Sequence, residues 1–220
     1  MFHDLLRTWF HWVELWGYPG VFILMAMESS IIPVPSEIVM PPAAFWAAQG
    51  RMSFAGVILA GTAGSYFGSL VSYWGARWMG EPLIRRYGKY VLLPPEKMAL
   101  AEDWVLRFGA SGVLVARLLP VVRHLVSIPA GVLKMPLGRF TGATLFGATL
   151  WCTVLSWLGQ QIIGDHPELL QSPEALVHVI KQKMIWIVLG VLLFGASLVA
   201  LQVAKKRLAV HRLPAEQKEA

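Results

Sequence analysis

Prolines interrupt two apolar stretches of the chain that would otherwise be long enough to cross a membrane. The first runs over 21–48 and is broken by PVPSE at 33–37, and the second runs over 111–135 and contains RLLPVVRHLVSIPAG at 117–131. Proline lacks a backbone donor and ends or kinks a helix. The arms that remain have about 10–12 residues and reach roughly halfway through a hydrocarbon core of about 30 Å.

Each interrupted stretch therefore predicts a re-entrant hairpin, which enters and leaves the membrane on the same side. Lipid cannot satisfy broken backbone, so we expect protein or a wet cavity to shelter both hairpins. The residues that we expect to shape the hairpins are Pro33, Pro35, Pro120, Pro129 and Gly131.

Composition places these hairpins in an integral membrane protein. Of the 220 residues, 56% are hydrophobic and 15% are charged, and the mean hydropathy is +0.56. Such values exceed what a soluble domain of this length needs. The chain is expected to be an all-α polytopic membrane protein with two re-entrant helical hairpins, about three full transmembrane helices and further amphipathic helices.

The segments are expected to follow one another within a single membrane domain over 1–220. In order they are an amphipathic helix (1–16), hairpin 1 (20–49), a span (54–79), a cytoplasmic amphipathic segment (80–110), hairpin 2 (111–135), a span (140–164), an external connection (165–183), a span (184–204) and a basic cytoplasmic tail (205–220).

The distribution of basic residues orients this arrangement. With the C-terminal tail in the cytoplasm, 13 lysines and arginines lie inside and 4 lie outside, which agrees with the positive-inside rule. The same distribution argues against nucleic acid as a partner, because the net charge of +6 marks topology and headgroup contacts. The hairpins then enter from opposite sides and each precedes a long helix, which is the pattern of an inverted repeat.

Four ionisable residues fall inside the hairpins. Glu28 and Glu37 bracket the first break, and Arg117 and Arg123 bracket the second. Each unpaired charge at the centre of a membrane helix costs about 2.5–3.5 kcal/mol, so we expect the four to be paired or hydrated. A packed apolar contact would join two hairpins without that cost, which favours a functional role over a purely structural one.

The residue types divide the expected roles. Arginine presents a planar fork of donors that suits a phosphate or carboxylate, and it stays charged. A carboxylate in low dielectric can take up and release a proton. Arg117 and Arg123 are therefore the candidate anion ligands, and Glu28 and Glu37 are the candidate carriers of a coupling ion; the sequence does not say which acid titrates. No spacing of histidine, cysteine or acid predicts a metal or cofactor site, and no phosphatase or protease signature predicts an enzyme.

The same motifs resemble the DedA family, also called SNARE-associated or VTT-domain proteins. The resemblance rests on ESSIIPVPSE at 28–37 and on Arg117, Pro120, Arg123 and the closing Ala-Gly at 130–131. It implies a multi-pass protein of the bacterial inner membrane, with a cytoplasmic C-terminus. It also implies a lipid transporter (flippase) that moves undecaprenyl phosphate or a related anionic lipid, coupled to protons or sodium ions.

Two other functions stay open at this point, namely a passive phospholipid scramblase and a small-ion exchanger. The lipid, the direction of transport and the coupling ion are not fixed by the sequence, and an oligomer is possible. An Arg–His pair at Arg117 and His124 lacks the partners of a lipid phosphatase, so the chain is expected not to be an enzyme.

Overall fold

The computed structural model describes residues 2–30, 34–87, 95–119, 122–123, 125–165, 175–176, 178–183 and 189–190. These residues form helices and turns, with no β-strand among them. Apart from 189–190, the expected span at 184–204 lies outside the described residues, as do the basic tail and residues 166–174 and 177 of the external connection.

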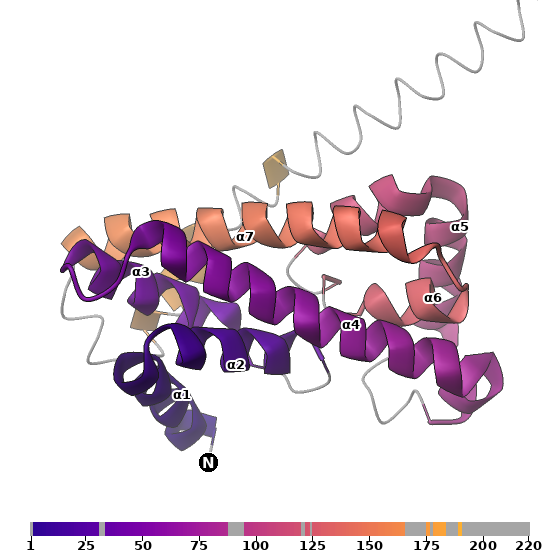
Figure 1. Ribbon diagram of the computed structural model, residues 1–220, viewed down its shortest axis with the longest axis horizontal. Helices are drawn as coiled ribbons and strands as arrows, with labels where there is room; N and C mark the ends of the chain where they lie inside the picture. Colours follow the sequence, from indigo (N-terminus) through magenta and orange to yellow (C-terminus); the bar gives the residue numbers. More distant parts are fainter. Residues whose placement is uncertain are drawn as a thin grey trace, which may run out of the picture.

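Two long helices form the centre of the fold. They are α4 (Phe54–Tyr87) and α7 (Leu137–Asp165), and they pack side by side while running in opposite directions (Figure 1). The parts Phe54–Met79 and Leu137–Asp165 are long and apolar enough to cross a membrane. Both agree with the spans expected from the sequence, except that α4 continues into the segment that was expected to be a separate amphipathic one.

Short helices cover both ends of this pair. At one end lie α1 (Phe2–Trp16), α2 (Tyr18–Glu28), the 3-10 turn η1 (Ser36–Ile38) and α3 (Met40–Ala48), and at the other lie α5 (Pro95–Arg117) and α6 (Ser127–Val132) (Figure 1). Helix α2, with 11 residues, has the expected length of a hairpin arm, whereas α3 and α6 are shorter, with 9 and 6 residues. Helix α2 ends at Glu28, so this acid closes a helix instead of lying inside one.

Three prolines lie at the beginnings of the returning arms. Pro41 and Pro42 are in the first turn of α3, and Pro129 is in the first turn of α6. First-turn amides have no acceptor within their own helix, so proline costs little there. These prolines begin the returning arms instead of kinking them. Pro35 precedes η1 with a φ of −71°, and Pro33 and Pro120 lie outside the described residues.

The packing partners of the short helices follow a regular pattern. Helix α2 packs on α4 and α3 packs on α7, whereas α5 packs on α7 and α6 packs on α4. Each pair of short helices therefore contacts both long helices. In this pattern α5 corresponds to α2, α6 corresponds to α3 and α7 corresponds to α4. If each helix is replaced by its counterpart, the same packing partners result.

Two glycine joints follow the same pattern. Gly17 connects α1 to α2 with φ 56° and ψ −125°, and Gly109 breaks α5 with φ 53° and ψ −131°. A residue with a Cβ is strained in this conformation, which is why glycine is found there. Both joints separate an N-terminal helix from a short helix that ends at one of the hairpin charges, Glu28 or Arg117.

Glycine also allows the short helices to approach the long ones closely. A Cβ on Gly64 or Gly68 of α4 would lie 2.2 or 2.1 Å from carbonyl oxygens of α2, and one on Gly131 of α6 would lie 2.3 Å from the Tyr73 carbonyl oxygen. Gly159 of α7 has the same relation to α3, at 2.3 Å from the Cα of Pro41. Small residues are what lets helix backbones approach in lipid.

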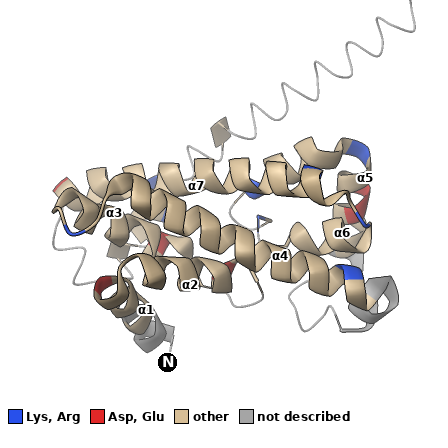
Figure 2. Cartoon of the chain, in the orientation of Figure 1, with Lys and Arg blue, Asp and Glu red and all other residues tan. Residues whose placement is uncertain are grey.

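The outer surface of the long helices is apolar. Large side chains are exposed along both, namely Leu59, Phe67, Val71, Trp74, Trp78, Phe146, Leu150 and Trp157. Charged residues occur only towards the ends of these two helices (Figure 2). Such a surface suits contact with lipid acyl chains.

Candidate functional site

The buried charged residues of the described chain are the four that the sequence singled out. Glu28 ends α2 and Glu37 lies in η1, with 8% and 7% of their surfaces exposed. Arg117 ends α5 and Arg123 lies in the turn before α6, with 3% and 5% exposed. All four lie at helix ends or turns, where the two groups of short helices approach the middle of the long pair.

Glu28 and Arg123 form an ion pair in this interior. The Arg123 Nη2 donates to Glu28 Oε1, and both side chains are almost fully enclosed. The two residues are 95 positions apart in sequence, so the pair fastens the end of α2 to the turn between α5 and α6. Among the described residues, the second carboxylate oxygen of Glu28 has no hydrogen-bond donor.

Arg117 is held differently. Its Nη2 donates to the Ser127 hydroxyl at 2.7 Å, and its guanidinium lies over the Phe140 ring at 6.0 Å. Its Nε has no hydrogen-bond partner among the described residues. Within the same ranges no carboxylate forms an ion pair with Arg117, so this buried cation keeps one unpaired donor.

Glu37 is also buried, but none of the ion pairs among the described residues includes it. Of the four charges, the structure therefore joins Glu28 to Arg123 and leaves Glu37 and Arg117 without an ionic partner among the residues described. The expected pairing is seen for Glu28 and Arg123.

Trp151, in the middle of α7, was not identified from the sequence and connects the two sets of short helices. Its ring lies 4.8 Å from the guanidinium of Arg123, and its indole N–H donates to the Ser36 hydroxyl at 3.3 Å. Only 3% of the side chain is exposed. A tryptophan inside an apolar helix gives no sequence signal for such a role, because tryptophans in membrane helices most often face lipid or the interface.

Hydroxyl groups extend the polar interior along α4. The Ser29 and Ser65 hydroxyls are 2.8 Å apart, and the Ser72 hydroxyl donates to the Ser29 carbonyl at 3.3 Å. On α7, the hydroxyls of Thr144 and Ser156 are buried and find no hydrogen-bond partner in the described part of the chain. These groups give the protein interior hydrogen-bonding capacity that an apolar core would lack.

The model of the VTT domain matches residues 34–161, which is more than half of the chain and includes Glu37, Arg117 and Arg123. The chain belongs to the VTT-domain family. This is the family that its hairpin motifs resemble, and it makes the chain a membrane protein. Glu28 lies just before the matched region.

Some curated relatives of this VTT-domain protein are named as transporters and others as phosphatase-like proteins. The undecaprenyl phosphate transporter A of Bacillus subtilis is 35% identical over 69% of this chain and 74% of its own, and that of Staphylococcus aureus is 32% identical over 68% and 76%. A Lactococcus lactis subsp. lactis protein named alkaline phosphatase-like is 36% identical over 70% and 74%. No solved structure matches the chain.

Proposed function

We propose that this protein is a lipid transporter that moves undecaprenyl phosphate or a related anionic lipid across the bacterial inner membrane. Relatives named as undecaprenyl phosphate transporters support the substrate class. The observation that carries the proposal for this chain is Arg117, a buried arginine with an unused Nε and no carboxylate partner among the described residues.

A lipid phosphate can provide the hydrogen-bond acceptor and the negative charge that Arg117 lacks among the described residues. Phosphate oxygens accept hydrogen bonds from the guanidinium fork, and its negative charge offsets the buried cation. Only the headgroup needs a polar route, since the prenyl tail stays soluble in the apolar phase. Arg117 is therefore the first ligand of the phosphate, and Ser127 orients it through the 2.7 Å hydrogen bond.

Arg123 is the second ligand and must first be released from Glu28. When Glu28 takes up a proton, it loses the charge that holds Arg123, and the phosphate can take its place. When the proton leaves, the ion pair re-forms and displaces the phosphate. Glu28 and Glu37 are in this way the candidate sites for the coupling proton or sodium ion.

The proposed topology is an inverted repeat with two re-entrant hairpins. The exchange symmetry of the helix contacts and the matched conformations of Gly17 and Gly109 support it. We further propose a third span at 184–204 and a cytoplasmic C-terminus, which follow from the distribution of basic residues. The segment boundaries given by the sequence then describe one membrane domain.

The transport test measures leaflet transfer of a fluorescent polyprenyl phosphate in proteoliposomes that contain the full chain. Arg117→Gln and Arg123→Gln are expected to reduce transfer at least about tenfold, since each removes a charge-assisted contact to phosphate. Arg107→Gln is the matched control, because Arg107 lies on the same helix but is exposed and pairs with Asp103. Full transfer by the Arg117 variant contradicts the proposal.

Imposed proton and sodium gradients test the coupling in the same vesicles. Wild type is expected to respond to one gradient, and Glu28→Gln is expected to lose that response. Transfer that ignores both gradients indicates a passive scramblase, and ion currents without lipid phosphate indicate a small-ion exchanger. Release of inorganic phosphate from the substrate would indicate the enzyme activity that the alkaline phosphatase-like name suggests.

A further inference from the structure

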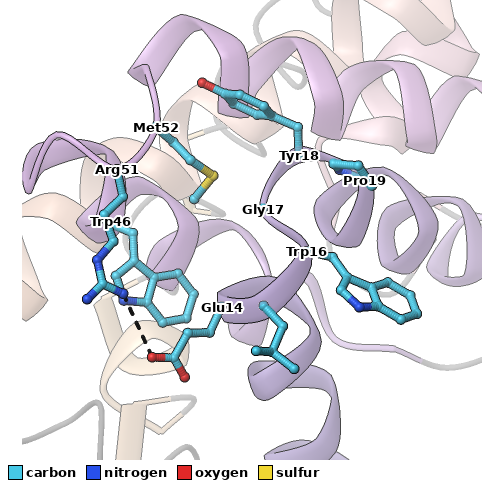
Figure 3. Close-up of a pocket in the computed structure, with 9 residues that line it drawn as sticks. Glu14, Trp16, Gly17, Tyr18, Pro19, Trp46, Arg51 and Met52 are labelled. Carbon is cyan, nitrogen blue, oxygen red and sulfur yellow. Dashed lines mark ion pairs between the residues drawn. The ribbon is translucent and has the colours of Figure 1, made fainter.

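A pocket of about 300 Å³ lies at the junction of α1, α2 and the loop between α3 and α4 (Figure 3). It is at the opposite end of α2 from Glu28, so it is separate from the buried ion pair. Its volume is at the lower limit for small-molecule sites. That size suits a lipid headgroup better than a whole lipid.

The polar side of the pocket carries one negative and one positive charge. Glu14 Oε1 and Arg51 Nη1 are 3.9 Å apart, beyond hydrogen-bond distance, and 43% and 62% of their side chains are exposed. The other carboxylate oxygen of Glu14 lies 3.7 Å from His11 Nδ1, also beyond a normal hydrogen bond, and the described residues show no hydrogen bond from either Glu14 or Arg51 to another side chain. The Glu14–Arg51 pair is therefore loose, and both charged groups can still form hydrogen bonds with a ligand.

The other sides of the pocket are apolar. The Trp46 indole lies beside the charged pair, and the Met52 sulfur points into the space next to Gly17 (Figure 3). At the rim, Leu15 and Trp16 are 63% and 48% exposed. Exposed tryptophan and leucine at the end of an amphipathic helix are typical of the headgroup region of a bilayer.

We infer that this pocket binds the zwitterionic headgroup of an aminophospholipid. The phosphate contacts Arg51, the ammonium group contacts Glu14 and the face of Trp46, and the glycerol and acyl chains leave across Leu15 and Trp16. The charges of the pocket sum to zero, which matches a zwitterion and disfavours an anionic headgroup. Ethanolamine is favoured over choline because its ammonium group can donate hydrogen bonds to the carboxylate. This site goes beyond the proposed transport function and does not depend on it.

The inference is tested with the full chain in detergent, titrated with phosphatidylethanolamine, phosphatidylcholine and phosphatidylglycerol of identical acyl chains and followed by native mass spectrometry. Wild type is expected to bind phosphatidylethanolamine most tightly. Glu14→Gln is expected to weaken this binding about fivefold, as loss of an exposed charge contact does, and to leave phosphatidylglycerol binding no weaker. Arg51→Gln is expected to weaken both.

A charge exchange separates a binding site from a simple fastening of α1. The double variant Glu14→Arg with Arg51→Glu keeps an ion pair but reverses its direction relative to the bilayer, so it is expected not to restore phosphatidylethanolamine binding. Asp103→Asn, in the exposed Asp103–Arg107 pair, is the matched control. Unchanged binding by Glu14→Gln, or full binding by the exchange variant, overturns the inference. Equal binding of free phosphoethanolamine overturns the assignment to a lipid.

Discussion

The Glu28–Arg123 pair allows a quantitative test of how the two groups of short helices are held together. Both side chains are more than nine-tenths buried. Removing one partner of a buried pair leaves an uncompensated charge and costs about 3–5 kcal/mol. Glu28→Gln is therefore expected to lower the free energy of unfolding by about 3 kcal/mol, at the lower end because the Trp151 ring still covers the guanidinium.

Arg123→Gln is expected to lower the free energy of unfolding by a similar amount, because it leaves the carboxylate of Glu28 buried without its partner. The double variant has no buried charge at either position and is expected to be no less stable than Glu28→Gln.

Unfolding in mixed detergent micelles, followed by circular dichroism, measures these free energies. The expected coupling energy from the four proteins is about 2–3 kcal/mol, whereas the exposed Asp103–Arg107 pair, measured the same way, should give less than about 1 kcal/mol. Added polyprenyl phosphate should stabilise Glu28→Gln more than wild type, because the phosphate replaces the missing charge. If the double variant loses as much free energy of unfolding as the two single variants together, this reasoning is refuted.

Two further predictions concern positions that the sequence did not reveal. Trp151→Leu removes the ring over Arg123 and should lower the free energy of unfolding by at least about 2 kcal/mol, because packing and the cation–π contact are lost. Trp151→Phe keeps an aromatic ring and should lower the free energy of unfolding by less. Equal effects of the two variants would show that the ring face is unimportant. Gly17→Ala and Gly109→Ala should each cost about 1–3 kcal/mol because of their backbone angles, and a neutral effect in the same unfolding assay would exclude strain at the joints.

The sequence predicted the helices that hydropathy and proline specify. The long apolar runs gave the spans at α4 and α7 within a few residues, since a charge-free helical stretch of that length has few alternatives. It also identified the charges that are buried, because acids and arginines inside apolar hairpins are conspicuous. It did not specify how the prolines of α3 and α6 are placed, because a proline in sequence indicates a helix break without saying on which side of the break it falls.

The pairing of the buried charges could not be predicted in the same way. Two acids and two arginines allow several ion pairs, and choosing Glu28 with Arg123 requires the positions of segments 95 residues apart. Trp151 and Ser36 were missed because their contact joins α7 to η1 across the interior. The repeated glycine joints were missed because many glycines occur in this chain, and only the backbone angles distinguish these two.

Local chemistry thus determined from the sequence alone where the chain is apolar, where its helices break and which charges enter the interior. These properties depend on transfer free energies and backbone donors, which each segment carries by itself. Tertiary structure decided that Arg123 is neutralised by Glu28, while the Arg117 Nε has no hydrogen-bond partner among the described residues. This pairing depends on how closely α2 and α6 pack against α4. The short distances between these helices are possible because glycines, on α4 towards α2 and on α6 towards α4, lie at the contacts.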